Sequence, residues 1–240
     1  MSQVEFSPEE YVNLVNSFLL EGYSIVDFKS VSPDERNLIL RHDIDFCLQR
    51  AARMAKLEQG IGVISTYFVL LSSNFYNVFS AQSQKFLREI LACGHNVGLH
   101  FDPLAHKDLE KGMKMEVHAL ESLIYDDISI VSFHRPHEEW LNSTQRICGI
   151  PHTYEPQFFS EIAYVSDARG GWHYGHPFGH QAVSEAHALQ LVTHPVWWMQ
   201  DEGERFTPTS VLTIFADEKN TDLQKNMADN CKSYQLPKLT

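Results

Sequence analysis

The sequence predicts an α/β fold in which most strands are parallel. Short apolar segments alternate with amphipathic helical segments along the chain, an order typical of strands joined by crossover helices. The chain has 240 residues, of which 43% are hydrophobic, which is sufficient for one large core. Polar residues that can act as ligands, acids or bases follow several apolar segments directly. We therefore expect a single domain over residues 1–240, with its site at the carboxyl ends of the strands.

The first elements are indicated by capping residues and apolar runs. Ser7, followed by Pro8 and Glu10, is a typical start for a helix. We expect this helix over residues 7–22, packed on the rest of the domain, and a short strand over residues 23–28. Further strands are predicted to begin at residue 38 and to span residues 66–71, 96–101, 128–133, 162–165 and 189–193, with helices at 47–59, 86–93, 107–123 and 208–230 and a loop at 151–160.

Composition argues against several classes of partner. The net charge is −12 and Lys and Arg are not clustered, so nucleic acid and anionic membranes are poor candidates. No apolar run approaches the ~18–20 residues of a membrane span, and no secretory signal is visible, so we expect a cytoplasmic protein. The four cysteines lack paired spacing, which is typical of reduced thiols. Oligomeric state has no signature in the sequence.

The segment Arg-His-Asp-Ile-Asp at residues 41–45 carries the strongest indication of a site. Side chains two residues apart on an extended chain point to the same side, which would bring Asp43 and Asp45 together. Like charges at that separation repel, so one must be protonated, paired with a cation or bound to a metal. Two interpretations follow: a strand-end ion-pair cluster with Arg41, or a site that performs chemistry.

Polar residues also follow two further predicted strands. His100 and Asp102 end one of them, and His134 and Arg135 end the next. Because the carboxyl ends of parallel strands meet at one edge of a sheet, these side chains should lie near the acidic pair. Carboxylate and imidazole ligands without thiolate suit zinc, or a harder ion such as manganese or cobalt.

These residues supply each part of a metal-dependent hydrolase. A catalytic zinc keeps an open position for water and lowers the pKa of that water toward ~7. Asp45 and His100 are the candidate ligands, Asp43 the candidate base, and His194 the candidate acid that protonates the leaving group. Arg135 is expected to orient Asp43 or to hold down the pKa of its carboxyl group.

The order of these motifs resembles that of the polysaccharide deacetylase superfamily, the NodB-homology domain of carbohydrate esterase family 4. The segment at 41–45 is similar to the first motif of a divergent branch, and the resemblance runs from about residue 38 to residue 198. It implies a distorted (β/α) barrel of about seven mostly parallel strands. It also implies a metal-dependent enzyme that removes acetyl groups, or formyl and related groups, from sugars.

The resemblance assigns roles to the first two motifs. It implies that Asp43 is the base and Asp45 a metal ligand, although one extra residue separates the two acids here, which could reverse the pair. The segment 94–100 is similar to the second motif and implies that His100 is the first metal histidine.

The second metal histidine of the family pattern would fall at Leu104, so another residue must complete the ligand set. Asp102, His106 and His134 are the alternatives. We favour His134, because it lies at the end of the next strand, whereas His106 lies beyond Pro103.

The remaining motifs imply further site residues. Ser-Phe-His-Arg-Pro at 132–136 is similar to the third motif, whose arginine contacts the base, here Arg135. Asp167 and Trp172 match the fourth motif, which lies near the site, and Leu-Val-Thr-His ending at His194 matches the fifth, whose histidine is the acid. Trp172, Asp102 and Trp197 are the predicted substrate-binding residues, although tryptophans here could equally be core.

The leading functional hypothesis is a metal-dependent deacetylase or wider amide hydrolase. Its substrate would be an acylated sugar, a sugar-nucleotide or a glycan precursor, and its metal zinc, with manganese, nickel and cobalt as alternatives. A catalytically silent relative that binds sugar in a surface-polysaccharide pathway is the alternative, because Leu104 replaces a ligand. Hydrolysis of another bond, such as a phosphoester, is disfavoured, since the chain has no Gly-rich phosphate loop and no basic cluster.

Overall fold

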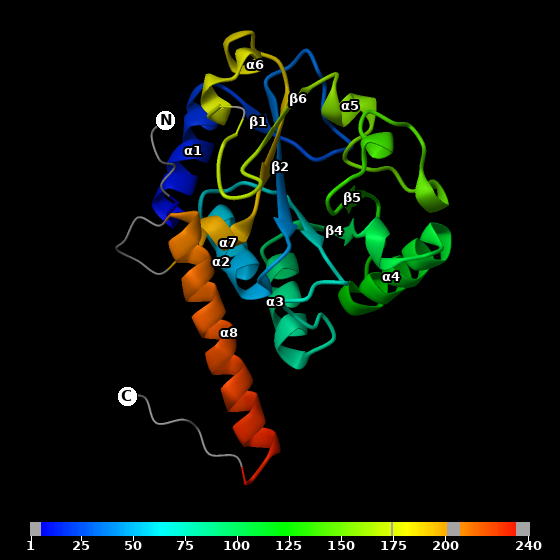
Figure 1. Ribbon diagram of the computed structural model, residues 1–240. Helices are drawn as coiled ribbons and strands as arrows, with labels where there is room; N and C mark the ends of the chain where they lie inside the picture. Colours follow the sequence, from blue (N-terminus) through cyan, green and yellow to red (C-terminus); the bar gives the residue numbers. More distant parts are fainter. Residues whose placement is uncertain (1–5, 174, 201–206, 234–240) are drawn as a thin grey trace.

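A curled parallel sheet forms the centre of the computed structural model, which describes residues 6–173, 175–200 and 207–233 (Figure 1). The strand order is β5-β4-β3-β2-β7-β6, and β1 pairs with β2. The sheet curls into a half-barrel with β5 and β6 at its edges, so the predicted α/β class with parallel strands is confirmed. The strands are β1 Ser24–Ile25, β2 Asn37–Ile44, β3 Thr66–Val69, β4 Asn96–Phe101, β5 Val131–Phe133, β6 Ala163–Ser166 and β7 Leu189–Thr193.

Helices connect successive strands and cover the sheet (Figure 1). α2, α3 and α4 pack against one another in order, and α1 packs against α2 and α7. The α-helices are α1 Pro8–Leu20, α2 Leu48–Gly60, α3 Ala81–Ala92, α4 Leu109–Ile124, α5 Pro156–Phe159, α6 Gln181–Ser184, α7 Pro195–Trp198 and α8 Pro208–Asn230, and 3₁₀ turns span Pro103–Ala105, Glu138–Trp140, Ile147–Gly149 and Pro177–Gly179. Among the described residues, none of the helices combines the length and apolar character needed to cross a bilayer.

Most predicted boundaries lie within about two residues of the observed ones, although the strands predicted at 23–28 and 128–133 are shorter in the structure. β4 and β7 have the predicted limits, and Ser7 caps α1 by accepting a hydrogen bond from the backbone N–H of Glu10. α3 begins before the predicted residue 86, because the Ser80 side chain caps it by accepting from the N–H of Ser83. The loop predicted at 151–160 contains the short helix α5.

β2 is the strand that positions the candidate site. It lies between β3 and β7, and each of its residues is buried. Side chains alternate along it, so Arg41 and Asp43 share one face while His42 points to the other. Its core partners include the neighbouring strands and α2, which packs directly on it.

A fully buried polar network fills the helix-facing side of β2. The Glu58 carboxylate of α2 accepts hydrogen bonds from Tyr11, Ser65 and Tyr67 and lies 2.8 Å from Nε2 of His42. The other ring nitrogen of His42 is 2.7 Å from Oγ1 of Thr193 in β7. Burial alone would raise the pKa of Glu58, but His42 and the hydroxyl donors lower it to about 2.

Replacing Glu58 with Gln should destabilise the protein strongly at pH 7. An amide cannot accept from all four donors, and loss of a buried ionic partner costs about 3–5 kcal/mol. Because the pKa of Glu58 is depressed from 4.5 to about 2 on folding, its contribution is complete above pH 4.5 and is lost as the pH falls toward 2. Urea unfolding should therefore show a smaller difference from the unmodified protein at pH 3 than at pH 7.

The control is Glu35→Gln, which changes an exposed loop carboxylate and should alter the unfolding free energy by no more than about 0.5 kcal/mol. An unchanged difference between Glu58→Gln and the unmodified protein at both pH values would contradict the ionised state assigned to Glu58.

Candidate metal centre and active site

A cavity of about 1290 Å³ opens at the carboxyl ends of the strands. Its lining brings together titratable residues from four separate parts of the chain. Asp43 and Asp45 lie at the end of β2, and His100 lies near the end of β4. His134 follows β5 directly, and His194 follows β7 directly. The structure therefore places these five predicted site residues around one space.

Three of these side chains converge with the spacing of a tetrahedral metal site. Asp45, His100 and His134 each offer a ligand atom, and these atoms lie within 4.8 Å of one another. Oδ1 of Asp45 is 3.2 Å from Nε2 of His100 and 3.4 Å from Nδ1 of His134, and the two nitrogens are 3.3 Å apart. With bonds of about 2.0–2.1 Å, ligand atoms of tetrahedral zinc lie about 3.3–3.4 Å apart. The donor set and its spacing therefore fit a zinc ion.

The surroundings of these atoms also fit a bound cation. Oδ1 of Asp45 is buried and makes no well-aligned hydrogen bond among the described residues, which is costly for a carboxylate oxygen without a cation. Burial works to raise the pKa of Asp45, but the imidazoles of His100 and His134 hold it well below its ordinary value. Nδ1 of His100 lies 3.1 Å from the Ser132 hydroxyl, which orients the ring and leaves Nε2 for a metal.

The turn that carries Asp45 beyond the end of β2 is held by two side chains. The Tyr76 hydroxyl donates a hydrogen bond to the Ile44 carbonyl at 2.8 Å, and the Ser73 hydroxyl donates to the Asp45 carbonyl at 2.8 Å. Both side chains come from the loop after β3. This loop therefore holds the backbone that carries the Asp45 carboxylate.

The other two residues considered for the third ligand have different partners. Oδ1 of Asp102 accepts a hydrogen bond from the backbone N–H of Leu104 and caps a 3₁₀ turn. His106 lies 2.6 Å from a Glu116 oxygen and stacks on the ring of Phe101. Leu104 itself is 84% exposed, so His134 is the residue that completes the set.

Asp43 is paired with Arg41 and not with Arg135, which corrects the expectation for Arg135. Nε and one terminal nitrogen of Arg41 donate to the two Asp43 oxygens at 2.9 and 2.7 Å. Burial works to raise the pKa of Asp43, but the Arg41 guanidinium keeps it below its ordinary value. Arg135 is exposed, and among the described residues it makes no hydrogen bond or ion pair. The sequence indicated this pairing through the two-residue spacing of Arg41 and Asp43, because alternate side chains of a strand lie on the same face.

Arg41 is itself completely buried and fully bonded. Its guanidinium also donates to the side chains of Gln190, Ser132 and Tyr154. Ser132 thus bonds both Arg41 and His100, linking the partner of the candidate base to a candidate metal ligand. Ser132 and Tyr154 were not among the residues predicted from the sequence, because hydroxyl residues carry no distinctive motif.

His194 and Asp167 form a second hydrogen-bonded pair at the cavity. Nδ1 of His194 is 2.6 Å from Oδ1 of Asp167, whose carboxylate also accepts from the His194 backbone N–H and from Nε1 of Trp198. Nε2 of His194 lies 3.8 Å from Oδ2 of Asp45. Burial works to lower the pKa of His194, but Asp167 and, more weakly, Asp45 and Asp43 raise it to about 9. The ring therefore holds a proton near the candidate metal ligand.

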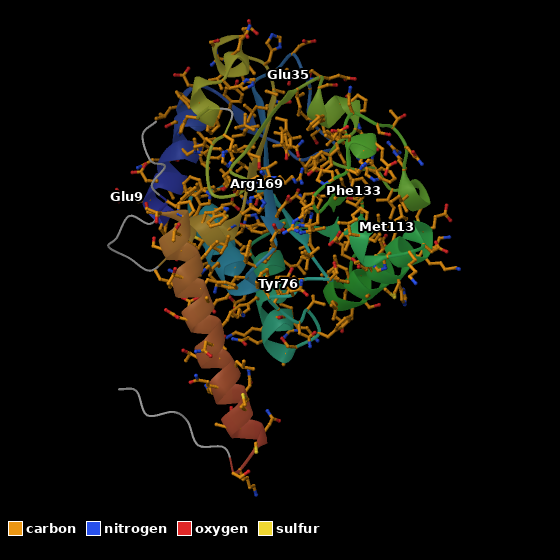
Figure 2. All side chains as sticks on the ribbon, viewed as in Figure 1. Glu9, Glu35, Tyr76, Met113, Phe133 and Arg169 are labelled. Atoms are coloured by element: carbon orange, nitrogen blue, oxygen red, sulfur yellow. The ribbon has the colours of Figure 1, made fainter. Side chains whose placement is uncertain are left out.

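Of the predicted substrate-binding residues, Trp197 lines the cavity, whereas Asp102 and Trp172 do not. Trp172 packs against Trp198, with ring centres 6.1 Å apart. The remaining walls are rich in apolar and aromatic side chains, Phe133 among them (Figure 2). They include Phe46, Phe133, Leu141, Tyr154, Phe159, Ile162, Tyr164 and Leu212.

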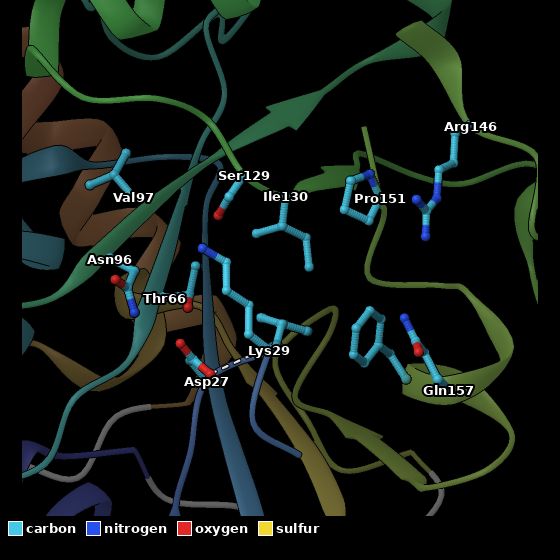
Figure 3. Close-up of a pocket in the computed structure, with 12 residues that line it drawn as sticks. Asp27, Lys29, Thr66, Asn96, Val97, Ser129, Ile130, Arg146, Pro151 and Gln157 are labelled. Carbon is cyan, nitrogen blue, oxygen red and sulfur yellow. Dashed lines mark hydrogen bonds between the residues drawn. The ribbon is translucent and has the colours of Figure 1, made fainter. Parts of the chain in front are cut away.

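A second cavity, of about 370 Å³, includes the first residues of β3 and β4 in its lining (Figure 3). Thr66, Asn96 and Lys29 line it together with Arg146, which is paired with Glu155. It holds no described group of three metal-ligating side chains. The chemistry-bearing residues are thus gathered in the larger cavity.

Comparison with known proteins gave likenesses in structure alone. No protein-family model matches the chain, and neither does any curated protein sequence. A family 4 carbohydrate esterase from Bacillus anthracis matches with a TM-score of 0.47 and 13% identity over 88% of this chain and 86% of that one. A carbohydrate esterase family 4 pseudoenzyme from the same organism matches at 0.46 and 12% over 81% of this chain, which spans 63% of that protein. The chitin deacetylase of Colletotrichum lindemuthianum matches at 0.44 and 15%, over 79% and 84% of the two chains.

Metal content of variants should identify the three ligands. Asp45→Ala, His100→Ala and His134→Ala should each abolish stoichiometric zinc after loading and dialysis, because two remaining ligands hold the ion weakly. Ser132→Ala removes the hydrogen bond that orients His100 and should weaken binding about 10–100-fold. Elemental mass spectrometry measures the zinc in each protein.

His106→Ala is the matched control for the third ligand, since His106 is bonded to Glu116, and it should keep its zinc. Loss of zinc in His106→Ala with retention in His134→Ala would reverse the assignment.

Unfolding measurements should show that Arg41 contributes far more than Arg135 to the free energy of unfolding. Arg41→Met leaves the buried Asp43 carboxylate without its cation and should cost about 3–5 kcal/mol in the free energy of unfolding. Arg135→Met changes an exposed side chain and should cost no more than about 0.5 kcal/mol. Urea unfolding of the metal-free proteins tests both, and the opposite order would return the Asp43 contact to Arg135.

Proposed function

We propose that this chain is a zinc-dependent deacetylase that acts on an acylated sugar, of the kind found in the polysaccharide deacetylase superfamily. The spacing of the Asp45, His100 and His134 ligand atoms carries the proposal. Oδ2 of Asp43 lies 3.8 Å from Nε2 of His100. Nε2 of His194 lies 3.8 Å from Oδ2 of Asp45. A candidate base and a candidate acid therefore both border the ligand set.

Asp43 is suited to accept the proton of the attacking water. A bound zinc ion would polarise the acyl carbonyl and make a water acidic enough to give up its proton to a carboxylate. The bidentate contact with Arg41 keeps Asp43 ionised and fixes the direction of both oxygens. Because Arg41 is immobilised by Gln190, Ser132 and Tyr154, the carboxylate is held before substrate arrives.

His194 is suited to protonate the leaving nitrogen or oxygen of the sugar. The Asp167 carboxylate accepts the Nδ1 proton of the ring, so Nε2 is the nitrogen that faces Asp45 and the ligand set. With its pKa raised to about 9, the imidazole carries a proton at neutral pH and can donate it to the departing group. Trp198 holds Asp167 in place through its indole N–H.

The walls of the cavity suit a sugar and its acyl group. Half-buried aromatic rings such as those of Phe159 and Tyr164 offer flat apolar surfaces, on which the C–H faces of a sugar ring pack. A methyl or short alkyl group of the acyl substituent finds similar apolar surroundings. Sugar amides and esters therefore fit better than small charged substrates without apolar surface.

Substitution of His194 should reveal its role as acid. His194→Ala should lower kcat on an N-acetylated amino sugar by about 10²–10⁴-fold, while the protein keeps its zinc. The same variant should lose much less activity on 4-nitrophenyl acetate, because nitrophenolate leaves without protonation. Asp167→Asn, which removes the carboxylate that positions the ring and raises its pKa, should reproduce this dependence on the leaving group. Steady-state kinetics with both substrates measures the ratio.

Equal losses on both substrates would contradict the role of His194 as acid. A zinc-loaded protein that binds sugars and hydrolyses neither compound would contradict the deacetylase proposal and leave the silent sugar-binding protein.

A further inference from the structure

Two arginines line the active-site cavity without a hydrogen bond or ion pair to any described residue. The chain has nine arginines, of which Arg205 lies outside the described residues. Five donate hydrogen bonds to protein acceptors, namely Arg36, Arg41, Arg50, Arg53 and Arg146. Arg135 and Arg169 have no hydrogen bond or ion pair among the described residues, and both belong to the cavity lining. Arg88, the remaining arginine among the described residues, is exposed on α3 and lies outside the lining.

The two arginines reach the cavity from different segments. Arg135 follows β5 directly. Arg169, which is labelled in Figure 2, lies in the turn after β6. Both have left-handed backbone conformations, with φ of 50° and 60°, which is uncommon for residues other than glycine. Both are exposed side chains, while Arg41 already neutralises Asp43. Neither arginine is therefore needed to balance the buried carboxylates.

This pair of cations is unusual in so acidic a protein. The chain carries 31 Asp and Glu against 19 Lys and Arg, and its overall field repels anions. A neutral sugar would gain little from two unpaired guanidinium groups. An anionic group on the substrate would gain charge-assisted hydrogen bonds from both.

We propose that Arg135 and Arg169 bind a phosphoryl group attached to the acylated sugar, so that the substrate is a sugar phosphate or sugar diphosphate derivative. This inference rests on the proposed function. A phosphoryl group has enough acceptor oxygens to take hydrogen bonds from two guanidinium forks, and their planar geometry matches it. A cavity of about 1290 Å³ also exceeds the ~300–1,000 Å³ of typical ligand sites, which leaves room for a group beyond the phosphate.

Binding of inorganic pyrophosphate to the zinc-free protein tests the anion site without any need for activity. Titration calorimetry in the presence of a chelator should show binding to the unmodified protein, weakened about tenfold or more by Arg135→Gln and by Arg169→Gln. Arg88→Gln makes the same change in charge outside the cavity and should bind as the unmodified protein does. Asp45→Ala should also retain binding.

Kinetics with matched substrates tests the role of the anion site in substrate choice. The ratio of kcat/KM for N-acetylglucosamine 1-phosphate to that for N-acetylglucosamine should exceed one and fall about tenfold or more in each arginine variant, but not in Arg88→Gln. A nucleoside diphosphate derivative of the same sugar forms a third arm. If kcat/KM is higher for the nucleoside diphosphate sugar than for the 1-phosphate, the remaining space in the cavity binds the nucleoside. If it is equal or lower, the substrate is the sugar phosphate.

Absence of pyrophosphate binding, or binding that neither arginine variant weakens, would overturn the inference even if the protein is an active deacetylase. Pyrophosphate binding that requires both arginines, in a protein that hydrolyses none of these sugars, would instead keep the anion site and overturn the proposed reaction.

Discussion

The site depends on one buried ion pair, between Arg41 and Asp43 on the central strand. A buried guanidinium is tolerated only where its donors are used, and here Asp43, Gln190, Ser132 and Tyr154 accept from them. These partners come from β2, β5, β7 and the segment before α5, so one side chain joins four parts of the chain. The pair therefore keeps the candidate base ionised and also fixes how the strands around the cavity are arranged.

The opposite face of β2 carries a second buried network, and the two act together. Glu58 and Thr193 hold His42 between α2 and β7. His42 precedes Asp43 and Thr193 precedes His194, so this contact across the strands fixes the register of β2 against β7. Register in turn determines the separation between the candidate base and the candidate acid. A polar network on the helix side of the sheet thus helps to position the candidate base and the candidate acid on the cavity side.

The sequence pattern predicted helices and strands well where the local run of residues determines the structure. β4 and β7 are short apolar runs between polar residues, and their limits were predicted from these runs alone. The convergence of Asp45, His100 and His134 followed from the rule that parallel strands end at one edge. The partner of Asp43 could not be decided in this way, because Arg41 and Arg135 were both within reach of a sequence argument. The structure decides between the two arginines: Arg41 bonds Asp43, whereas Arg135 follows β5 with a left-handed backbone conformation.

Leu104 and Arg135 are two positions at which this chain differs from the pattern that its sequence resembles. In the pattern that the sequence resembles, a histidine at residue 104 would complete the metal site and Arg135 would contact the base. Here His134 completes the ligand set, and its backbone N–H is bonded to the carbonyl of Phe101 at the end of β4. The next residue, Arg135, has a left-handed backbone conformation and lines the cavity, with no hydrogen bond or ion pair to the residues that the structure describes. Arg41 supplies the contact to Asp43 from two residues earlier on the same strand. The cation beside the candidate base is therefore Arg41 in the core, while Arg135 lies at the cavity wall.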